Sequence, residues 1–303
     1  DMPLEYNFYL ALEIHMEIVK KGLDNLMPIL NDQNYTTTLF TTANFANKYP
    51  DSIKALSDKH EIASHTFYHS NFTTAHLLAS RIRLEEIIQK PVKGLRMPRM
   101  RQVRVGDINE AGYSYDASIH PTWLPGRYNN FNLPRTKYSE QGLIRVPASV
   151  SPNFRVPLFW LSFKNFPYAM YLKLALQTLK KDGYLSSYFH PWEFTNITAF
   201  GLPKYTTKGS DNELLDKLYR LLNDLNKQAE FVTMGDFTCN TAVLDSQKII
   251  CDYAMLSSWK TSNLFSNYLP RMLNSCYHFE LVKEIRKRHG RLFFPVSPDY
   301  TSG

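Results

Sequence analysis

The feature that most constrains the fold of this chain is a regular alternation of strand-like and helix-like segments. Short runs rich in β-branched and apolar residues predict strands at residues 36–42, 61–65, 93–98, 113–119, 183–190 and 231–234. Helical periodicity lies between these runs, at residues 11–30, 49–59, 74–89, 105–111, 168–181 and 211–228. Strands that alternate with helices form parallel βαβ units, so the sequence predicts an α/β fold, either a barrel or a doubly wound sheet.

Length and composition exclude several classes of protein. With 303 residues, of which 44% are hydrophobic and 21% charged, the chain can bury a sizeable core. No stretch reaches about 18 apolar residues without a charge, so we expect no membrane span. The first residues lack the pattern of a secretory signal, and the cysteines, at 239, 251 and 276, make no metal-spaced pair. We therefore expect a cytoplasmic protein without a disulfide framework.

The net charge of +7 is unevenly distributed. Residues 240–303 hold 8 basic and 5 acidic side chains, so this short tail carries +3 of the total. Its densest run, EIRKRHGR at 284–291, is typical of the solvated face of a helix. No nucleic-acid-binding motif accompanies it, so we expect no nucleic acid partner. A basic interaction protein is the alternative that the charge leaves open.

Two histidines follow the strand-like segment EIASH. His65 and His69 are four residues apart, and imidazoles at this spacing can converge on one divalent cation if the segment turns helically. Thr66 is placed to brace such a turn. The alternative is a pair of surface histidines without a ligand.

Two further strand ends carry polar groups. His190 lies in YFHPWEF, before a proline and among aromatic residues, where a general acid or base would be well placed. Arg96 lies in LRMPR, where a guanidinium can orient a carboxylate. A buried structural histidine and a surface salt bridge are the respective alternatives. In parallel α/β folds the carboxyl ends of the strands form the site, so we expect these groups to converge.

Four segments resemble motifs of the polysaccharide deacetylase family, carbohydrate esterase family four. They are HEIASHTFYHSNF, KGLRMPR, GYSYDASIHP and YFHPWEF, in the family's order, and they extend the resemblance over about residues 11–237. The resemblance implies a distorted (β/α) barrel with fewer than eight complete units over residues 1–237. It also implies a Zn²⁺-type metal and the removal of N-acetyl groups from a polysaccharide or glycan precursor, such as a cell envelope glycan.

The resemblance also implies roles for individual residues. His65 and His69 would hold the metal, Arg96 would position a catalytic aspartate, and His190 would protonate the leaving amine. The backbone near Arg99 would help to stabilise the oxyanion. Aromatic side chains that would stack on the sugar are Trp123, Tyr128 and Trp192.

One departure from the family pattern bears on activity. The family's first strand ends in an aspartate motif that supplies the catalytic base and a third metal ligand, and no such strand precedes residue 11. We expect that this strand lies upstream of the given sequence and that hydrolysis is impaired in this chain. A non-catalytic glycan-binding relative of the deacetylases is the alternative.

Residues 238–303 have no counterpart in the family, and we expect a C-terminal extension. Residues 248–250 and 291–296 predict strands, and residues 279–288 predict a helix. The run from residue 275 onward is similar to the opening of certain glycosyltransferases. The alternative is an ordinary helical extension that packs on the barrel.

Overall fold

The computed structural model describes residues 4–124, 128–200, 202–239 and 247–255, and only the backbone of residues 4–15, 128 and 199. Residues 1–198 and 202–260 form one compact unit. Within the described part of this unit, no helix is both long and apolar enough to cross a membrane.

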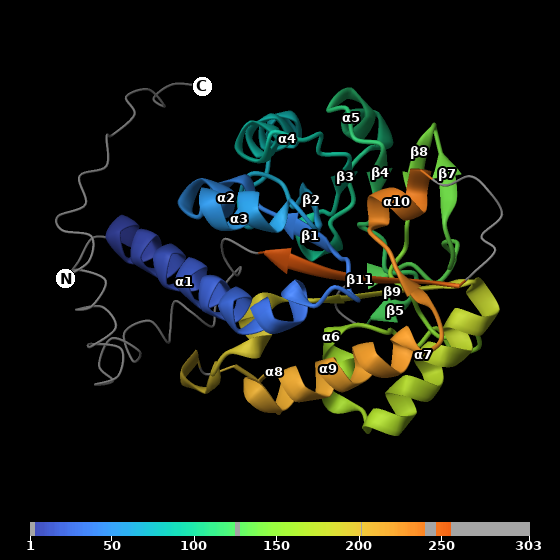
Figure 1. Cartoon of the computed structure of the whole chain (residues 1–303). Helices are drawn as coiled ribbons and strands as arrows, with labels where there is room; N and C mark the ends of the chain where they lie inside the picture. The colour runs from blue at the N-terminus through green and yellow to red at the C-terminus, as the bar shows by residue number, and fades with distance from the viewer. Residues whose placement is uncertain (1–3, 125–127, 201, 240–246, 256–303) are drawn as a thin grey trace. The chain divides into compact units, whose positions relative to one another are not determined.

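Helices and strands alternate along the unit (Figure 1). The helices are α1 Leu4–Asn31, α2 Ala43–Lys48, α3 Pro50–Leu56, α4 Ala75–Ile88, α5 Val105–Glu110, α6 Trp160–Asn165, α7 Tyr168–Asp182, α8 Lys204–Thr207, α9 Asn212–Asn226 and α10 Met234–Cys239. Short 3₁₀ turns are η1 Pro98–Met100, η2 Pro191–Phe194 and η3 Thr198–Phe200. The strands are β1 Thr38–Thr41, β2 Glu61–Ser64, β3 Gly94–Leu95, β4 Tyr115–Asp116, β5 Trp123–Leu124, β6 Tyr128–Asn129, β7 Tyr138–Glu140, β8 Leu143–Arg145, β9 Tyr184–Phe189, β10 Glu230–Phe231 and β11 Lys248–Met255.

Most strands form one curled sheet in the order β10-β11-β1-β2-β3-β4-β8-β7, with β9 also paired to β11. All its pairs are parallel except the hairpin β7–β8. After β8 the chain reaches β9, since Ser149 N donates to the Ser186 carbonyl at 2.8 Å. The sheet therefore curls round toward itself, which confirms the predicted distorted (β/α) barrel.

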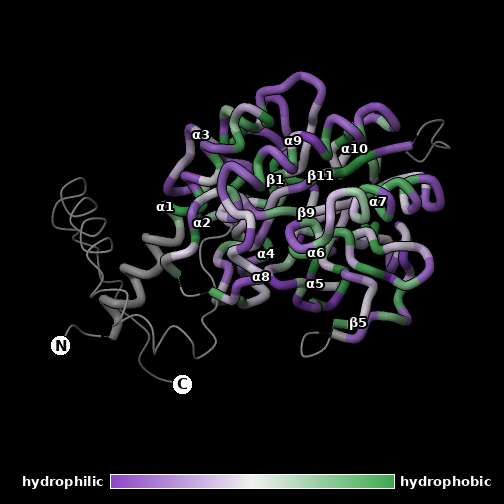
Figure 2. Tube along the Cα trace, turned by 90° about the horizontal axis from the view of Figure 1, so that it is seen from below, coloured by the Kyte–Doolittle hydropathy of each residue, from purple (hydrophilic) through white to green (hydrophobic). Residues whose placement is uncertain are grey.

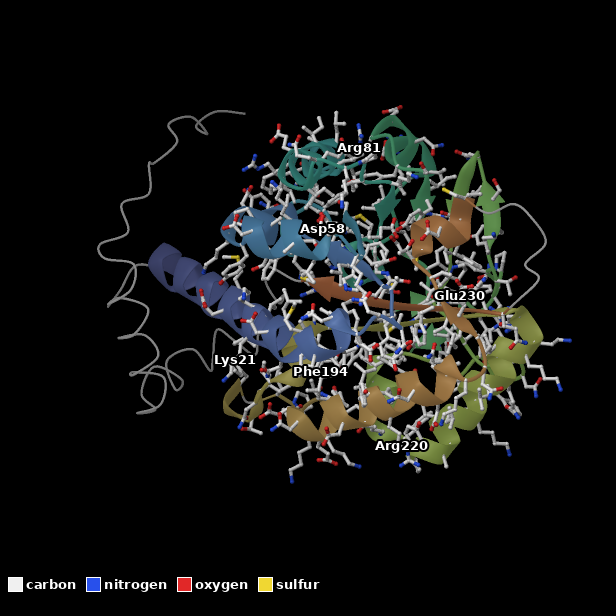
Figure 3. The ribbon with its side chains drawn as sticks, viewed as in Figure 1. Lys21, Asp58, Arg81, Phe194, Arg220 and Glu230 are labelled. Atoms are coloured by element: carbon white, nitrogen blue, oxygen red, sulfur yellow. The ribbon has the colours of Figure 1, made fainter. Side chains whose placement is uncertain are left out.

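One hydrophobic cluster joins buried side chains of the strands and of the segments that follow them to two side chains of helix α10. This cluster consists of Phe40, Ala63, Tyr115, Ala117, Val146, Tyr184, Met234, Phe237 and Ile250. Hydrophilic and hydrophobic stretches alternate along the outer helices (Figure 2), as amphipathic helices require. Charged side chains such as Lys21, Asp58 and Arg220 lie exposed on these outer elements, whereas Phe194 is buried (Figure 3).

The predicted elements are present, but α1 begins at Leu4 rather than at residue 11, and α2 and α6 were not predicted. The other differences lie near the carboxyl end of the unit. The strand predicted at 231–234 stops at Phe231, because α10 begins at Met234. The strand predicted at 248–250 extends to Met255 and lies between β1 and β9, inside the barrel sheet. The predicted domain boundary at residue 237 therefore falls within the compact unit. The elements predicted at 279–288 and 291–296 lie outside the described residues.

β11 lies between β1 and β9 and supplies hydrogen-bond partners for the backbone of both strands. The edges of β1 and β9 would otherwise present unpaired backbone groups, and the apolar run IICDYAM is buried from Ile249 to Met255. We expected the sheet to lack a strand at this point. Instead a strand from the far end of the unit fills the gap.

Candidate active site

The loop that follows β2 places His65 and His69 together. Both side chains are buried, and their ring centroids lie 5.5 Å apart. The Nδ1 atom of His65 lies 2.7 Å from the Arg96 carbonyl oxygen, which can only accept, so Nδ1 carries the proton and Nε2 keeps its lone pair. Burial, helped by the charges of Arg96 and His190, lowers the pKa of His65 to about 3, so the ring is neutral at pH 7.

The loop is not the helical turn that we expected for the HxxxH spacing. Thr66, between the two histidines, has a left-handed backbone with φ of 63°. Its hydroxyl donates to the Tyr68 carbonyl at 2.9 Å and its N–H donates to Ser64 Oγ at 3.1 Å. Thr66 therefore braces the loop, as predicted, but by holding a tight non-helical bend.

Arg96 follows β3, and its side chain is buried, with 2% of its surface exposed. Its guanidinium donates to both carboxylate oxygens of Asp252 on β11, and Nε donates to the Ala117 carbonyl at 3.1 Å. The rings of Phe40 and Tyr188 lie 4.5 Å and 5.0 Å from the guanidinium carbon. We expected the given sequence to lack a carboxylate partner for Arg96. Asp252 on β11 supplies one.

Asp252 is completely buried, and its surroundings shift its pKa in opposite directions. Burial raises the pKa of Asp252 to about 6, while the Arg96 charge and its hydrogen bonds oppose that rise. The carboxylate is therefore ionised and clamped by Arg96 at neutral pH. Pairing with Arg96 leaves each carboxylate oxygen a second lone pair, but complete burial limits the access of water to Asp252.

His190 ends β9 and is oriented by the turn that follows. The buried carboxylate of Glu193 accepts from the His190 backbone N–H at 2.8 Å and from Nδ1 at 2.9 Å. The Nδ1–H bond leaves His190 Nε2 for other partners. Trp192 stacks on the His190 ring with centroids 5.3 Å apart, and Trp160 contacts it edge-on at 5.4 Å.

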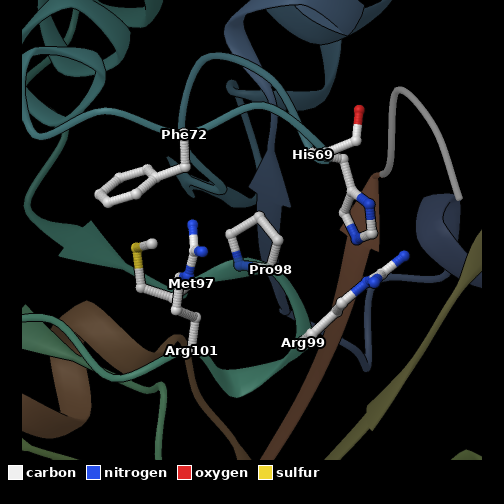
Figure 4. Close-up of a pocket in the computed structure, with 7 residues that line it drawn as sticks. His69, Phe72, Met97, Pro98, Arg99 and Arg101 are labelled. Atoms are coloured by element: carbon white, nitrogen blue, oxygen red, sulfur yellow. The ribbon is translucent and has the colours of Figure 1, made fainter. Parts of the chain in front are cut away.

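A small cavity of about 100 Å³ adjoins His69 (Figure 4). Ser70 and Phe72 line it from the loop after β2, and Met97, Arg99 and Arg101 line it from the segment after β3. The predicted residues His69 and Arg99 therefore share one cavity. Its size suits one substituent of a sugar rather than a whole ring.

The three aromatic residues predicted to stack on a sugar have different environments. Trp123, on the β5–β6 hairpin, is 62% exposed and presents a free face. Trp192 is buried and covers His190, so it does not offer a stacking surface. Tyr128 lies on β6, and its side chain is outside the described residues.

The side chains near His65 can be compared with the ligands that the implied metal requires. A catalytic zinc normally has three protein ligands. Nδ1 of His65 is hydrogen-bonded to a backbone carbonyl, as in most metal-binding histidines, which leaves Nε2 for a metal. His69 lies beside His65. Among the described residues, however, no three His, Cys, Asp or Glu side chains come together in a way that could hold a metal ion. The described residues therefore do not form a three-ligand zinc site.

Two residues of this site were missed by the sequence analysis. Glu193 lies within the quoted segment YFHPWEF, and the signal was its i+3 spacing from His190 across a proline that begins a helical turn. Asp252 lies in the run IICDYAM, where one acid within an apolar strand was the signal. A buried carboxylate needs a partner, and Arg96 was the available one.

Part of the chain matches the model of a known protein family. Residues 17–113 match the model of the polysaccharide deacetylase family, described as "Polysaccharide deacetylase", which confirms the resemblance over that segment. No curated protein matches the chain.

Several of the solved structures that match are deacetylases or CE4 family proteins. A CE4 family pseudoenzyme from Bacillus anthracis has a TM-score of 0.43 and 11% identity, over 77% of this chain and 64% of its own. The peptidoglycan N-acetylglucosamine deacetylase Bc1960 has a TM-score of 0.40 and 19% identity, over 73% of this chain and 81% of its own. The Xyl-CE4 domain of a multidomain xylanase from the Trinervitermes trinervoides hindgut metagenome has a TM-score of 0.41 and 15% identity, over 75% of this chain and 89% of its own.

Proposed function

We propose that this protein binds N-acetylated glycans and hydrolyses their acetamide groups slowly, as an impaired polysaccharide deacetylase. The observation that carries the proposal is the arrangement of His65 and His190. Each ring directs Nδ1–H to a fixed backbone or carboxylate oxygen, so each keeps an Nε2 lone pair for a ligand. The two residues follow different parallel strands of one sheet, β2 and β9.

The reaction adds water to the acetyl carbon, breaks the C–N bond and transfers a proton to the departing amine. In this proposal His190, which Glu193 orients, accepts a proton from the attacking water on Nε2 and then gives that proton to the departing amine. The cavity beside His69 holds a substituent of the sugar, and the exposed Trp123 stacks on a neighbouring ring.

Two features support slow hydrolysis. Asp252 is completely buried, so water reaches it poorly and general base assistance, typically worth about 10²–10⁴-fold in rate, is weak. The described residues offer Zn²⁺ two imidazoles, whereas a catalytic site has three protein ligands. We therefore expect weak Zn²⁺ binding and little acetate release.

The test measures Zn²⁺ affinity by calorimetry and acetate release from N-acetylchitotetraose with the 303-residue protein. We expect a dissociation constant no tighter than micromolar, little acetate, and loss of Zn²⁺ binding in His69→Ala. His76→Ala is the matched control, because His76 is a nearby histidine outside the pair. Rapid acetate release would refute the proposed impairment. Unchanged Zn²⁺ binding in His69→Ala would refute the role of the pair.

The clamped Asp252 favours a second candidate, a glycan-binding protein without hydrolytic activity. Its distinguishing result is saturable binding of N-acetylchitotetraose with acetate release no faster than in His190→Ala. Acetate release that falls in His190→Ala favours the first candidate.

A further inference from the structure

The cavity beside His69 is strongly basic. Arg99 and Arg101 both line it and both are exposed, while none of the described residues that line it is acidic. His69 is the remaining titratable group among those residues. An arginine-lined cavity without carboxylates attracts an anionic group.

Arg101 differs from the other arginines of this segment. Arg96 is paired with Asp252, and Arg104 donates to both oxygens of Asp107. Arg101 forms no ion pair with any described residue, and its guanidinium lies over the Phe72 ring at 5.4 Å from the centroid. The contact with Phe72 holds the guanidinium at the cavity (Figure 4) and leaves its N–H donors for a ligand.

The backbone on this side of the cavity is also unusual. Arg99 and Met100 are consecutive residues with left-handed backbones, with φ of 59° and 57°. Across the cavity the loop that carries His69 contains Thr66, with φ of 63°. Non-glycine residues rarely adopt this conformation, and where they do they cluster at ligand-binding sites, because the surrounding structure must hold them in place. The left-handed pair Arg99 and Met100 therefore forms the tight bend that precedes Arg101, and both arginines reach the cavity.

We propose that the glycan bound at this site carries a carboxylate beside the N-acetyl sugar, and that Arg101, with Arg99, binds it. This inference rests on the proposed function for the sugar, but binding of the carboxylate requires no hydrolysis. The planar fork of arginine suits a carboxylate, which accepts two parallel hydrogen bonds. Two kinds of glycan supply such a group, those with uronic acid residues and those with a lactyl ether on the amino sugar.

Calorimetry with the full chain distinguishes these sources. The probes are a heparosan tetrasaccharide, with uronate and N-acetyl groups, and a disaccharide of N-acetylglucosamine and N-acetylmuramic acid, with a lactyl carboxylate. N-acetylchitotetraose lacks the carboxylate, and tetragalacturonate lacks the N-acetyl group. We expect at least one of the first two probes to bind about tenfold tighter than N-acetylchitotetraose, and the tighter one identifies the source.

Arg101→Gln should remove most of that tenfold preference, and Arg104→Gln, the matched control outside the cavity, should keep it. Both side chains are exposed, so the melting temperature should not change and a loss of binding cannot be attributed to unfolding.

The outcomes separate this inference from the proposed function. Equal binding of N-acetylchitotetraose and both carboxylate probes overturns the inference and leaves the proposed function standing. An equal loss in Arg104→Gln also overturns it, because the attraction would then be general surface charge. Tight, Arg101-dependent binding of tetragalacturonate without any binding of N-acetylchitotetraose supports the carboxylate site and refutes the proposed function. No binding of any probe refutes both.

Discussion

The two sides of the candidate site are assembled in different ways. Residues 65–101 supply His65, His69, Arg96 and the arginine-lined cavity from one continuous stretch, inside the segment that matches the deacetylase family. On the opposite side, His190 and Glu193 follow β9, and Asp252 lies on β11, the neighbouring strand, which comes much later in the sequence. The first side is local in sequence, whereas the second exists only once the sheet has formed.

The difference shows which interactions hold the site together. In the 65–101 stretch, short loops with left-handed residues fix the side chains. On the β9–β11 side, buried carboxylates do so, each with a single cationic or imidazole partner. The Arg96–Asp252 pair links the two sides, so removing its carboxylate should destabilise the molecule far more than removing a carboxylate at the surface.

The strongest test of this comparison is Asp252→Ala. It leaves the Arg96 charge buried without a partner, and breaking a buried pair in this way costs about 3–5 kcal/mol of unfolding free energy. Urea denaturation at pH 7 measures the loss. Asp58→Ala is the control, since Asp58 pairs with Lys90 at the surface and should cost less than about 1 kcal/mol. Equal losses in the two variants would show that β11 is not held by this pair.

A smaller effect is expected for Glu193→Ala. The variant removes the acceptor of two hydrogen bonds from His190 and should cost about 1–3 kcal/mol. The ¹⁵N shifts of the imidazole should also show that the proton is no longer confined to Nδ1. Glu230→Ala, at an exposed pair with Lys248, should change neither quantity measurably. A His190 tautomer that persists without Glu193 would contradict the assigned positioning role.

His60, which lies outside both sides of the candidate site, should make the unfolding free energy depend on pH. Burial lowers the pKa of His60 to about 4, and its Nε2 lies 2.9 Å from the Leu30 carbonyl. The unfolded chain, with a histidine pKa near 6.5, then binds more protons than the folded chain between pH 4 and 6.5. Stability from His60 is complete above pH 6.5 and is lost as the pH falls.

Wild type should therefore lose about 1–2 kcal/mol more than His60→Gln between pH 7 and pH 5. The difference between the two proteins, measured by urea denaturation at each pH, cancels the contributions of distant groups. Parallel pH curves would mean that His60 is protonated equally in both states.

The smallest stability effect is expected for Trp123→Ala. The side chain is 62% exposed on the β5–β6 hairpin, so unfolding free energy should change by less than about 0.5 kcal/mol. Affinity for N-acetylchitotetraose should nevertheless fall several-fold if the indole stacks on a sugar. Trp192→Phe, inside the fold, should show the reverse, with lower stability and its main effect through His190. Unchanged affinity in Trp123→Ala would remove the hairpin from the binding surface.

Much of the fold and of the 65–101 side could be predicted from the sequence. The period of the apolar residues predicted α4, α7 and α9 to within two residues at each end, because each helix buries one face. His65, His69 and Arg96 were found because a polar residue after a short buried strand stands out locally.

The role of Asp252 could not be predicted, because it depends on a pairing between distant strands. The residues of IICDYAM do not determine which sheet edge the strand joins. Asp252 lies opposite Tyr188 because β11 pairs with both β9 and β1. The bend at Thr66 was missed for a different reason. A left-handed threonine contradicts its intrinsic preference and is imposed by Ser64, Tyr68 and the strand end.

The position of β11 has a consequence for the order in which the protein can fold during synthesis. β1 and β9 are both made well before residue 248, yet each needs β11 as its neighbour. Until residues 248–255 leave the ribosome, the nascent chain must keep two sheet edges unpaired and Arg96 without its carboxylate. Ribosome-bound chains that stop before β11 are therefore expected to depend on chaperones, and those that extend beyond it to become protease-resistant.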